Sequence, residues 1–258
     1  MFRFVDANLR LALRFFGRAS GRGVIEDRDG MMLIDSGVDY AVFNIAMITE
    51  PVETQAQLEY RVARASEWYA ARHTRWSLWV CDDLLAPQVR LVASAIFARY
   101  RLHALTQAPG MLAERLSPLS RYLPSMEYKL VSDTQSRTDF AHLTTLCFDI
   151  PFVTAQAVYQ PEDAWTGDYV GYVGYLNRRA ICTAAVVISD DAVGLYSVAT
   201  IPEYRRKGYA EALMRQVLQD ATRVSGIQRT VLQATRAGHQ TYQKMGYQDV
   251  TRFSVYIL

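Results

Sequence analysis

Cysteine, histidine and an excess of charge of one sign are all scarce in this chain, and each scarcity excludes a class of protein. The three cysteines, Cys81, Cys147 and Cys182, are odd in number and widely spaced, which argues against a disulfide framework or a cysteine zinc site and indicates a reducing compartment. The four histidines are scattered and form no metal-ligand pattern. The 28 lysines and arginines nearly balance the 26 acidic residues, so the one-sided basic excess of nucleic-acid-binding proteins is missing.

Long uninterrupted apolar runs are also missing. Residues 1–17 are apolar but include Arg3, Arg10 and Arg14, so they suit neither the core of a signal peptide nor a membrane span, which needs about 20 apolar residues. We therefore expect a cytoplasmic protein. An amphipathic helix with arginines can lie on a membrane surface, but we expect this one to pack its leucines and phenylalanines on the rest of the protein.

What the chain does have is a large apolar fraction, since half of its 258 residues are hydrophobic and 12% are aromatic. A chain of this size and composition can bury one large core or two smaller ones. Residues 117–123, which contain Pro118 and are followed by Pro124, are the expected linker between two halves.

The most informative segment is the basic turn at residues 201–210, which reads IPEYRRKGYA. It contains an Arg-x-x-Gly-x-Ala pattern that begins at Arg205. Gly208 lets the backbone approach a ligand closely, and the N–H groups that begin a helix favour anions. Arg206 and Lys207 add positive charge at the same place. The pattern predicts a phosphate-binding turn, although a solvated basic turn before an ordinary helix would have a similar sequence.

The segments around the basic turn follow an α/β order. A strand over 194–201 precedes it, and an amphipathic helix that ends at Gly226 follows it. A strand over 229–234, a short helix over 239–245 and a strand over 251–258 come next. The carboxyl end of a strand is where α/β proteins bind ligands. The apolar face of the amphipathic helix consists of Ala210, Leu213, Met214, Val217, Leu218 and Ala221.

Two segments together resemble the GNAT superfamily of N-acetyltransferases. Residues 198–210 look like the acetyl-CoA motif of that family, and residues 239–247, HQTYQKMGY, are similar to its second signature, in which a tyrosine precedes a glycine–aromatic pair. The resemblance implies that residues 126–258 form an N-acetyltransferase (GNAT) domain. Its fold would be α/β (α+β), a mixed and mostly antiparallel central sheet flanked by helices.

The earlier elements of such a domain are also recognisable. A strand is expected over 127–131, and Ser132 or Asp133 can cap the helix that follows. A short helix over 154–159 would then lead into a hairpin. The two strands of that hairpin are expected over 169–176 and 180–188.

The first half of the chain carries a faint echo of the second. Residues 42–48 parallel residues 195–201, and a proline follows each run. After Pro51, however, the chain reads VETQ, without the glycine turn or the arginines. We therefore expect residues 1–120 to form a degenerate GNAT-like domain without a phosphate-binding turn, as in tandem members of the superfamily, which would wall the acceptor pocket. Its expected helix face consists of Leu58, Val62, Ala65 and Tyr69.

The resemblance implies acetyl-CoA (coenzyme A) as the cofactor. Backbone groups of Val198 and Thr200 would run beside the pantetheine arm, and the N–H groups of the basic turn would hold the pyrophosphate. The side chains of Arg206 and Lys207 would either add charge or only face solvent. The implied cofactor-binding residues are Val198, Thr200, Arg205, Arg206, Lys207, Gly208, Tyr209 and Ala210.

The implied reaction transfers an acetyl group to an amine, which must lose a proton while the departing thiolate gains one. Tyr242 stands at the family's tyrosine position and is the implied general acid, with His239 as a weaker alternative. Many members carry a glutamate base on the motif strand, where this chain has Tyr196 and Ser197, and Thr235 stands where an asparagine is frequent.

The general base and the acceptor are left open by the sequence. The base candidates are Glu203, Asp149, Glu162, Asp163 and a water relayed through Ser197. The leading hypothesis is an acetyl-CoA-dependent N-acetyltransferase acting on the amine of a small molecule or a peptide. Its alternative is a non-catalytic acyl-CoA-binding regulatory module, and a longer acyl donor is a third possibility. The aromatic residues that would line either an acceptor site or the core are Phe148, Phe152, Tyr159 and Trp165.

Overall fold

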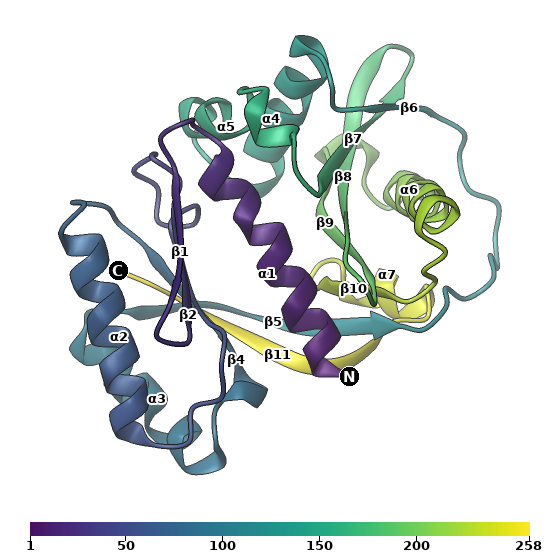
Figure 1. Cartoon of the computed structure of the whole chain (residues 1–258). Helices are drawn as coiled ribbons and strands as arrows, with labels where there is room; N and C mark the ends of the chain where they lie inside the picture. Colours follow the sequence, from purple (N-terminus) through teal and green to yellow (C-terminus); the bar gives the residue numbers. More distant parts are fainter.

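One sheet of eleven strands runs through the molecule in the computed structural model, which describes residues 1–258 (Figure 1). The strand order is β1-β2-β3-β4-β11-β5-β10-β9-β8-β7-β6, and neighbours are antiparallel except in the β3–β4 and β9–β10 pairs. The predicted mixed, mostly antiparallel sheet is therefore confirmed. The strands are β1 (Val24–Arg28), β2 (Met31–Asp35), β3 (Ile45–Ile48), β4 (Ser77–Cys81), β5 (His103–Ala113), β6 (Glu127–Leu130), β7 (Tyr169–Leu176), β8 (Arg179–Ile188), β9 (Val193–Thr200), β10 (Thr230–Gln233) and β11 (Gln248–Ile257).

Helices cover both faces of the sheet. In the second half of the chain, α6 lies on one face of β7–β9, and α1, α4 and α5 lie on the other (Figure 1). No helix combines the length and the hydrophobicity that a bilayer crossing requires. The helices are α1 (Phe2–Arg18), α2 (Gln55–Ala70), α3 (Pro87–Arg99), α4 (Thr134–Phe148), α5 (Phe152–Tyr159), α6 (Tyr209–Ser225) and α7 (His239–Lys244).

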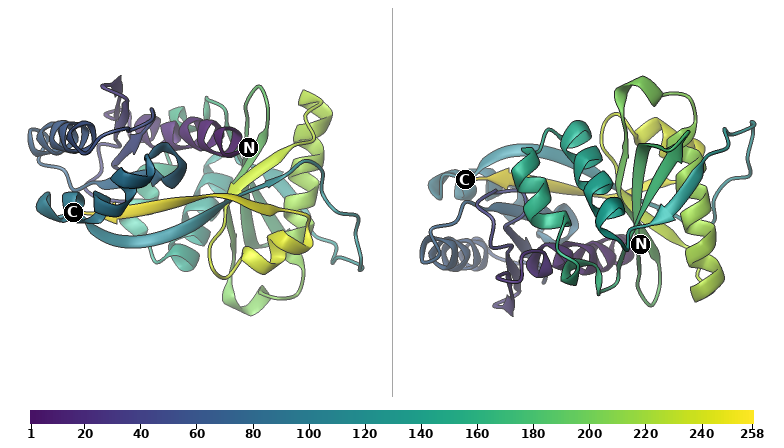
Figure 2. Two further views of the ribbon diagram at one scale, coloured as in Figure 1. Left: turned by 90° about the horizontal axis from the view of Figure 1, so that it is seen from below. Right: turned by 90° about the horizontal axis from the view of Figure 1, so that it is seen from above.

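The two halves of the chain exchange strands at the centre of the sheet. β5, from the first half, pairs with β10, where Met111 lies opposite Leu232. β11, from the second half, pairs with β4, where Val255 lies opposite Trp79, and also with β5. Figure 2 shows β5 and β11 running side by side across the molecule. Each half of the sheet is thus completed by a strand from the other half of the chain.

The helix α1 packs between the two halves. Its Leu9 and Leu13 belong to the core of the first half. On its other side the Phe15 ring lies 4.4 Å from the ring of Tyr169 and 5.0 Å from that of Trp165, in the core of the second half. The prediction that this helix packs its apolar face on the protein is confirmed, and α1 is in contact with both cores.

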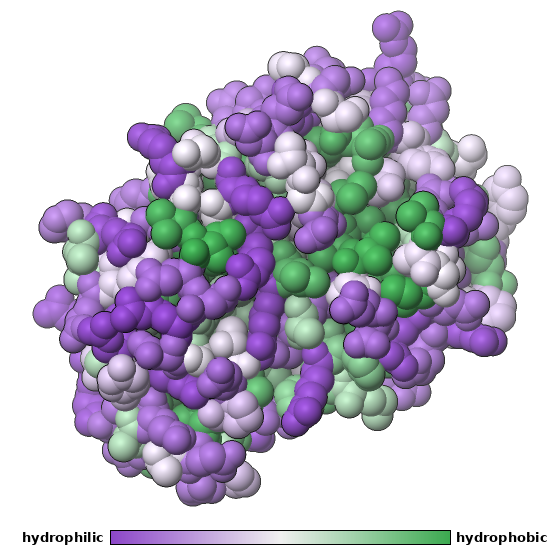
Figure 3. Space-filling model, viewed as in Figure 1, coloured by the Kyte–Doolittle hydropathy of each residue, from purple (hydrophilic) through white to green (hydrophobic).

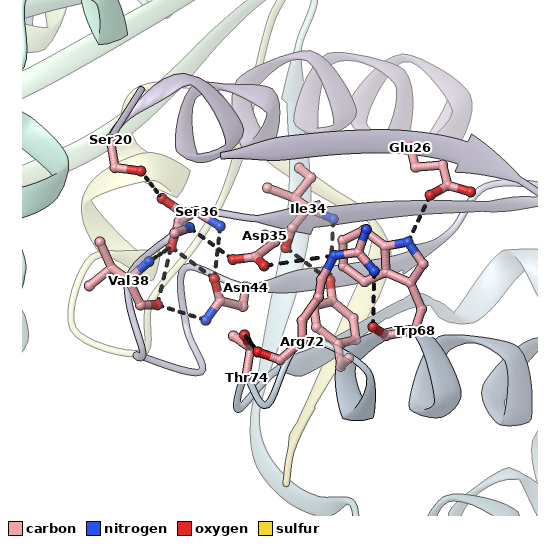
Figure 4. A network of polar contacts seen from close by, with 12 residues as sticks. Ser20, Glu26, Ile34, Asp35, Ser36, Val38, Asn44, Trp68, Arg72 and Thr74 are labelled. Atoms are coloured by element: carbon pink, nitrogen blue, oxygen red, sulfur yellow. Dashed lines mark hydrogen bonds and ion pairs between the residues drawn. The ribbon is translucent and has the colours of Figure 1, made fainter. Parts of the chain in front are cut away.

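In the first half, the sequence placed one strand too early and missed others, among them β5. The expected strand at 42–48 begins only at Ile45, because Asn44 is buried in a polar network: its Oδ1 accepts from Ser36 N at 2.9 Å, and its Nδ2 donates to Val38 O at 2.8 Å (Figure 4). The strand β5 was not predicted, since Pro109 and Gly110 interrupt the strand pattern. Pro109 lies where the pairing with β10 ends, one residue beyond Gly110, and its carbonyl accepts a hydrogen bond from Ala234 N at 2.9 Å.

Candidate active site

The strands β9 and β10 diverge next to the basic turn. They are paired only where Thr230 lies opposite Val193 and Val231 lies opposite Gly194. Beyond Gly194, β9 therefore has no neighbour on its β10 side. Hydrogen-bonded pairs alternate in an antiparallel ladder, and Ile201 N donates to Ile181 O of β8 at 3.0 Å. Ala199, two residues before Ile201, therefore also directs its backbone N–H and C=O groups toward β8. Further back along β9, a bulge interrupts this alternation.

This bulge lies at Ser197. Tyr196 is opposite Ala185 and Ala199 is opposite Thr183, so β9 has one residue more than β8 between these pairs. Ser197 has a positive φ of 45°, a strained conformation for a serine. From Ala199 to Ile201 the ladder to β8 is regular. The residues on either side of Ala199, namely Val198 and Thr200, thus direct their backbone N–H and C=O groups away from β8. These groups face the space where β9 and β10 diverge.

The basic turn presents a row of free backbone N–H groups. A 3₁₀ turn, Pro202–Tyr204, is followed by two residues with positive φ, Arg206 at 60° and Gly208 at 93°. The N–H groups from Arg206 through Glu211 donate no hydrogen bond within the chain, and the first backbone bond of α6 runs from Ala212 N to Gly208 O. These groups converge at a positive helix end, which is the arrangement that binds anions.

Gly208 is required by both conformation and space. It is the N-cap of α6 in the left-handed region, where it can provide no capping side chain. A Cβ added to it would lie 3.0 Å from Pro124 Cδ and 3.4 Å from Leu123 Cδ2. A larger residue would therefore fill the space beside the free N–H groups.

The side chains of the basic turn have different environments. Arg205 folds back so that its Nε donates to Thr200 O at 2.8 Å. Lys207 Nζ lies 5.4 Å from the centre of the Tyr204 ring, and the Tyr209 ring makes an edge contact with the same ring. Arg206 is exposed and makes no ion pair or hydrogen bond through its side chain. Of the three basic residues predicted to bind the cofactor, Arg206 and Lys207 thus extend beside the turn, whereas Arg205 is hydrogen-bonded to the end of β9.

The first half of the chain provides an internal comparison, because α2 follows β3 as α6 follows β9. The start of α2 is closed by its own side chains: Thr54 Oγ1 accepts from Gln57 N at 3.2 Å, and Gln57 Oε1 accepts from Glu53 N at 2.8 Å. Val52 also bridges to Leu85 beyond the end of β4, so β3 and β4 stay connected where β9 and β10 diverge. Only the N–H groups of Gln55 and Ala56 stay free at this helix start, and the two strands do not diverge there.

Tyr242 lies on α7 and is almost completely buried. Burial raises the pKa of its phenol to about 12. The ring is close to Gly238, where an added Cβ would be 2.7 Å from Tyr242 Cε2, and 5.9 Å from the ring of Tyr247. His239, the alternative acid, is paired with Asp249 through Nε2 at 2.8 Å. Thr235, at the family's asparagine position, accepts from Gly238 N through Oγ1 at 3.2 Å.

Four of the base candidates lie at the surface. Asp149 is the left-handed C-cap of α4 and is exposed, as are Glu162 and Asp163. Glu203 is exposed and pairs with Arg179 at 3.3 Å. The fifth candidate involves Ser197, which lies at the bulge itself.

The bulge is held by buried polar contacts that the sequence did not reveal. The Tyr169 hydroxyl lies 2.7 Å from Ser197 Oγ, and Thr183 Oγ1 donates to Ser197 O at 2.7 Å. Burial raises the pKa of Tyr169 far above its ordinary value, so its phenol is neutral. Tyr169 belongs to a strand that is distant in sequence, and no motif marks it.

Asn8 of α1 also reaches the bulge. Its Nδ2 donates to Val187 O at 3.0 Å and to Ala192 O at 3.1 Å, and its Oδ1 accepts from the Tyr196 hydroxyl at 2.6 Å. The approach is so close that a Cβ on Gly194 would lie 1.8 Å from Asn8 Oδ1. The one signal in the sequence was an asparagine on the apolar side of a helix.

The aromatic residues of the 148–165 segment divide into two groups. Tyr159 is buried in the core, and Trp165 packs against that core with its Nε1 donating to Tyr159 O at 2.9 Å. Phe148 and Phe152 are exposed at the junction of α4 and α5. Only the second pair is therefore accessible to a ligand.

The surface beside the basic turn is hollowed. A cavity of about 350 Å³ lies between α4 and the turn that joins β7 to β8, and it includes Ile201 at the start of the basic turn. Figure 3 shows hydrophobic surface between α1 and α6, over β8 and β9, surrounded by hydrophilic areas. The lining of the cavity is mixed in character: Asp139, His142, Leu143, Leu146, Arg178, Arg179, Ala180 and Ile201.

These residues fit the anionic end and the amide-bearing arm of a CoA thioester. The free N–H groups and the space that a Cβ on Gly208 would fill suit phosphate oxygens. In addition, Thr200 Oγ1 and Gln233 Nε2, at the ends of the two diverging strands, are buried without a hydrogen-bond partner. Buried polar atoms are normally bonded, so both are available to a polar ligand.

Comparison with known proteins agrees with this geometry. Residues 131–247 match the model of the acetyltransferase (GNAT) family. A GCN5-related N-acetyltransferase from Kribbella flavida superposes with a TM-score of 0.71 at 16% identity, over 98% of this chain and 95% of that one. A tandem GNAT protein from the clavulanic acid biosynthesis pathway superposes with a TM-score of 0.59 at 12% identity, over 98% and 95%.

A third similar structure is a functionally unknown conserved protein from Staphylococcus epidermidis, with a TM-score of 0.63 at 13% identity, over 92% of this chain and 94% of that one. No curated protein matches the chain in sequence. At these identities the structural likeness establishes the fold, and the family model covers the bulge, the basic turn and Tyr242. Residues 131–247, slightly less than half of the chain, are thus similar in sequence to the acetyltransferase (GNAT) family, and the fold of the chain is that of the GCN5-related N-acetyltransferases it superposes on.

Proposed function

We propose that this protein is an acetyl-CoA-dependent N-acetyltransferase that acts on the amine of a small molecule or a peptide. Acyl-CoA-dependent acetyl transfer is the general activity of the family. The observation that carries the proposal is the row of free N–H groups from Arg206 through Glu211, next to a strand that has no neighbouring strand on one side beyond Gly194. The equivalent helix start in the first half is closed by Thr54 and Gln57.

The cofactor-binding residues of this proposal are those that the sequence indicated. Val198 and Thr200 would pair with the amide groups of the pantetheine arm, and the N–H groups of the basic turn would hold the pyrophosphate. Arg206 and Lys207 would add charge-assisted contacts, because their side chains are exposed beside the turn. When bound, acetyl-CoA supplies the thioester acetyl group.

In the proposed reaction the amine nitrogen forms a bond to the acetyl carbon, the carbon–sulfur bond breaks, and the sulfur takes a proton. Tyr242 would donate that proton. A phenol with a pKa of about 12 is fully protonated at neutral pH, and it is a stronger acid than the water that would otherwise serve. The phenolate that remains would then be reprotonated from solvent.

The proton that the amine loses has no carboxylate to accept it at the bulge, where Tyr196 and Ser197 stand. We propose that a water accepts it, positioned by Ser197 and the bulge backbone. Ser197 is a suitable anchor because Tyr169 and Thr183 fix its hydroxyl and its carbonyl. Such an arrangement suits an acceptor amine that is largely neutral near pH 8 better than one with a lysine-like pKa of about 10.4.

The first half of the chain would serve as a degenerate GNAT-like domain. Under this proposal residues 1–120 bind no acetyl-CoA, because the start of α2 is capped and β3 and β4 stay connected. Residues 126–258 would carry the reaction, and α1, through Asn8, would support the bulge from the other half. The division is functional, since the sheet itself is continuous.

The test is calorimetric titration of acetyl-CoA into the wild type, Gly208→Glu and Gly226→Glu. Gly226 has a positive φ of 76° at the other end of α6 and no atom within 4 Å of an added Cβ, so it matches the backbone strain without touching the turn. We expect micromolar binding that is weakened by more than tenfold, or 1.4 kcal/mol, in Gly208→Glu only. Equal weakening in both variants, or no binding to the wild type, would sink the proposal.

A non-catalytic acyl-CoA-binding regulatory module is the second candidate, because no carboxylate faces the bulge. Acetyl-CoA consumption with a panel of amines, followed by thiol release, separates the two. Steady release with any amine above the rate of hydrolysis establishes the enzyme. Tight binding without release for the whole panel favours the module.

A further inference from the structure

The segment that joins the two halves, residues 114–126, passes around α6 on its way from β5 to β6 (Figure 1). Three of its residues approach the position that a Cβ on Gly208 would occupy. Pro124 Cδ is 3.0 Å from that position, Leu123 Cδ2 is 3.4 Å and Arg121 Nη2 is 3.6 Å. A segment that the sequence marked only as a linker therefore borders the basic turn.

Hydrogen bonds from two arginines connect this segment to α6. Arg121 Nη2 donates to Glu211 Oε2 at 2.9 Å, and Arg215 Nε donates to Glu211 Oε1 at 3.0 Å. Arg215 Nη1 also donates to Ser117 O at 2.9 Å. Burial of Glu211 opposes its ionisation, but the hydrogen bonds from Arg121 and Arg215 outweigh it and lower the pKa of the carboxyl. Glu211 is therefore charged, and each of its oxygens is engaged.

This arrangement leaves Arg121 with donors to spare. A guanidinium has five N–H donors in a planar fork, and Arg121 uses one nitrogen, on Glu211. Its side chain is 54% exposed, whereas that of Glu211 is 11% exposed. The second guanidinium, from Arg215, already balances the charge of Glu211. The fork of Arg121 thus faces the solvent beside Gly208, with its own net charge uncompensated there.

We propose that Arg121 is a further cofactor-binding residue, whose guanidinium contacts a phosphate group of CoA at the basic turn through the donors that Glu211 leaves free. This inference rests on the proposed function. A guanidinium fork binds two phosphate oxygens at once, and such charge-assisted bonds are stronger than those of the neutral N–H groups beside it. The linker would thus contribute directly to the affinity of the acetyltransferase half for its cofactor.

The test is calorimetric titration of CoA and of 3′-dephospho-CoA into wild type, Arg121→Gln and Arg223→Gln. Arg223 is a matched control, because it is an exposed arginine that pairs with Asp220 on the same helix, away from the turn. We expect Arg121→Gln to weaken CoA binding by about tenfold and Arg223→Gln by less than about twofold. If the contact is to the 3′-phosphate, the loss vanishes with 3′-dephospho-CoA; if it is to the pyrophosphate, the loss persists.

The variant Glu211→Gln distinguishes a phosphate-binding role of Arg121 from a purely structural role, in which Arg121 only holds the linker against α6. If Arg121 only pins the linker, removing its carboxylate partner should weaken CoA binding as much as Arg121→Gln does, and that result would overturn the inference. If Arg121 contacts a phosphate, Glu211→Gln should bind CoA as well as the wild type or more tightly, because an anion beside the phosphate site is lost.

Two other results are decisive. Unchanged or tighter CoA binding by Arg121→Gln, with the wild type binding at micromolar affinity, would refute the role of Arg121 and leave the proposed function intact. Absence of CoA binding by the wild type itself would overturn both. Circular dichroism melting of each variant verifies that the titrated protein is folded.

Discussion

At the scale of single residues, Gly208 and Thr54 occupy equivalent places before α6 and α2, and they give these helices opposite properties. Thr54 provides a hydroxyl that accepts from Gln57 N, and the Gln57 side chain accepts from the Thr54 backbone in return, so the start of α2 is capped from within. Gly208 provides no side chain and adopts a left-handed conformation, so the first turn of α6 stays open. A helix start can therefore be a closed structural element or an anion site, depending on its N-cap residue and on the one three positions later.

A second residue-scale expectation concerns Tyr242. Replacing it with phenylalanine removes the proposed proton donor and keeps the ring packing, so we expect kcat to fall by about 100-fold while the Kd for acetyl-CoA stays within about twofold. Tyr247→Phe, a change at the neighbouring ring, is the matched control. Steady-state kinetics and calorimetry measure the two quantities, and an unchanged kcat would remove Tyr242 from the mechanism.

The pH dependence of the wild type gives the same residue a further check. A general acid works only while protonated, and the pKa of Tyr242 is about 12. Its contribution to kcat should therefore be constant from pH 6 to pH 10 and decline only above that range. A fall in kcat between pH 6 and pH 9 would exclude Tyr242 as the group that donates the proton.

At the scale of elements, α1 supports the bulged strand β9 from the opposite half of the chain. Asn8 is completely buried, and its side chain bonds Val187 O, Ala192 O and the Tyr196 hydroxyl. Asn8→Ala would leave those buried groups unpaired, at about 1–3 kcal/mol for each unsatisfied group. We expect the free energy of unfolding to fall by about 3 kcal/mol.

Urea denaturation followed by circular dichroism measures this loss. The control is Arg3→Ala, a change at an exposed position of the same helix, which should alter stability by no more than about 0.5 kcal/mol. A loss below about 1 kcal/mol in Asn8→Ala would mean that waters replace the amide, and that α1 is held by its apolar contacts alone.

The same elements show what the sequence could and could not predict. The helix α6 was predicted from its apolar spacing to its end, and Gly226 does form its left-handed C-cap. The helix α4 begins at a capping box between Asp133 and Ser136, as the expected Asp133 cap implied. These features are local, since a few neighbouring residues determine them.

The features that the sequence could not predict depend on distant contacts. Tyr169 and Asn8 reach the bulge from a strand and a helix that no local pattern connects to it. The strand β5 contains Pro109 and Gly110 and exists because β10 and β11 pair with its two edges. Likewise, the sequence located the basic turn, but only the packed chain brings Arg121 beside it.

At the scale of the whole molecule, the exchange of β5 and β11 predicts that the halves do not fold independently. Residues 126–258 alone would lack β5, which leaves β10 without a partner on one edge and β11 without partners on both. We expect this fragment to be unfolded or aggregated, because unpaired strand edges promote association. Co-expression with residues 1–125 should restore a soluble one-to-one complex.

Size-exclusion chromatography and circular dichroism of the fragment, alone and co-expressed, measure this outcome. A cut in the exposed segment after residue 118, with both pieces present, is the control for cleavage itself, since it disrupts no strand. A monomeric 126–258 fragment with a cooperative melting transition would show that the exchanged strands are dispensable for folding.

The exchange of strands also determines when, during synthesis of the chain on the ribosome, the sheet can be completed. The strand β4 ends at Cys81, but its partner β11 is complete only at Ile257. At 5–20 residues per second, a ribosome needs roughly 10–35 s to cover that interval. For that time the nascent chain holds an apolar strand edge that nothing in the first half can cover, so molecular chaperones that shield such edges should determine how much of the newly made protein reaches its native state.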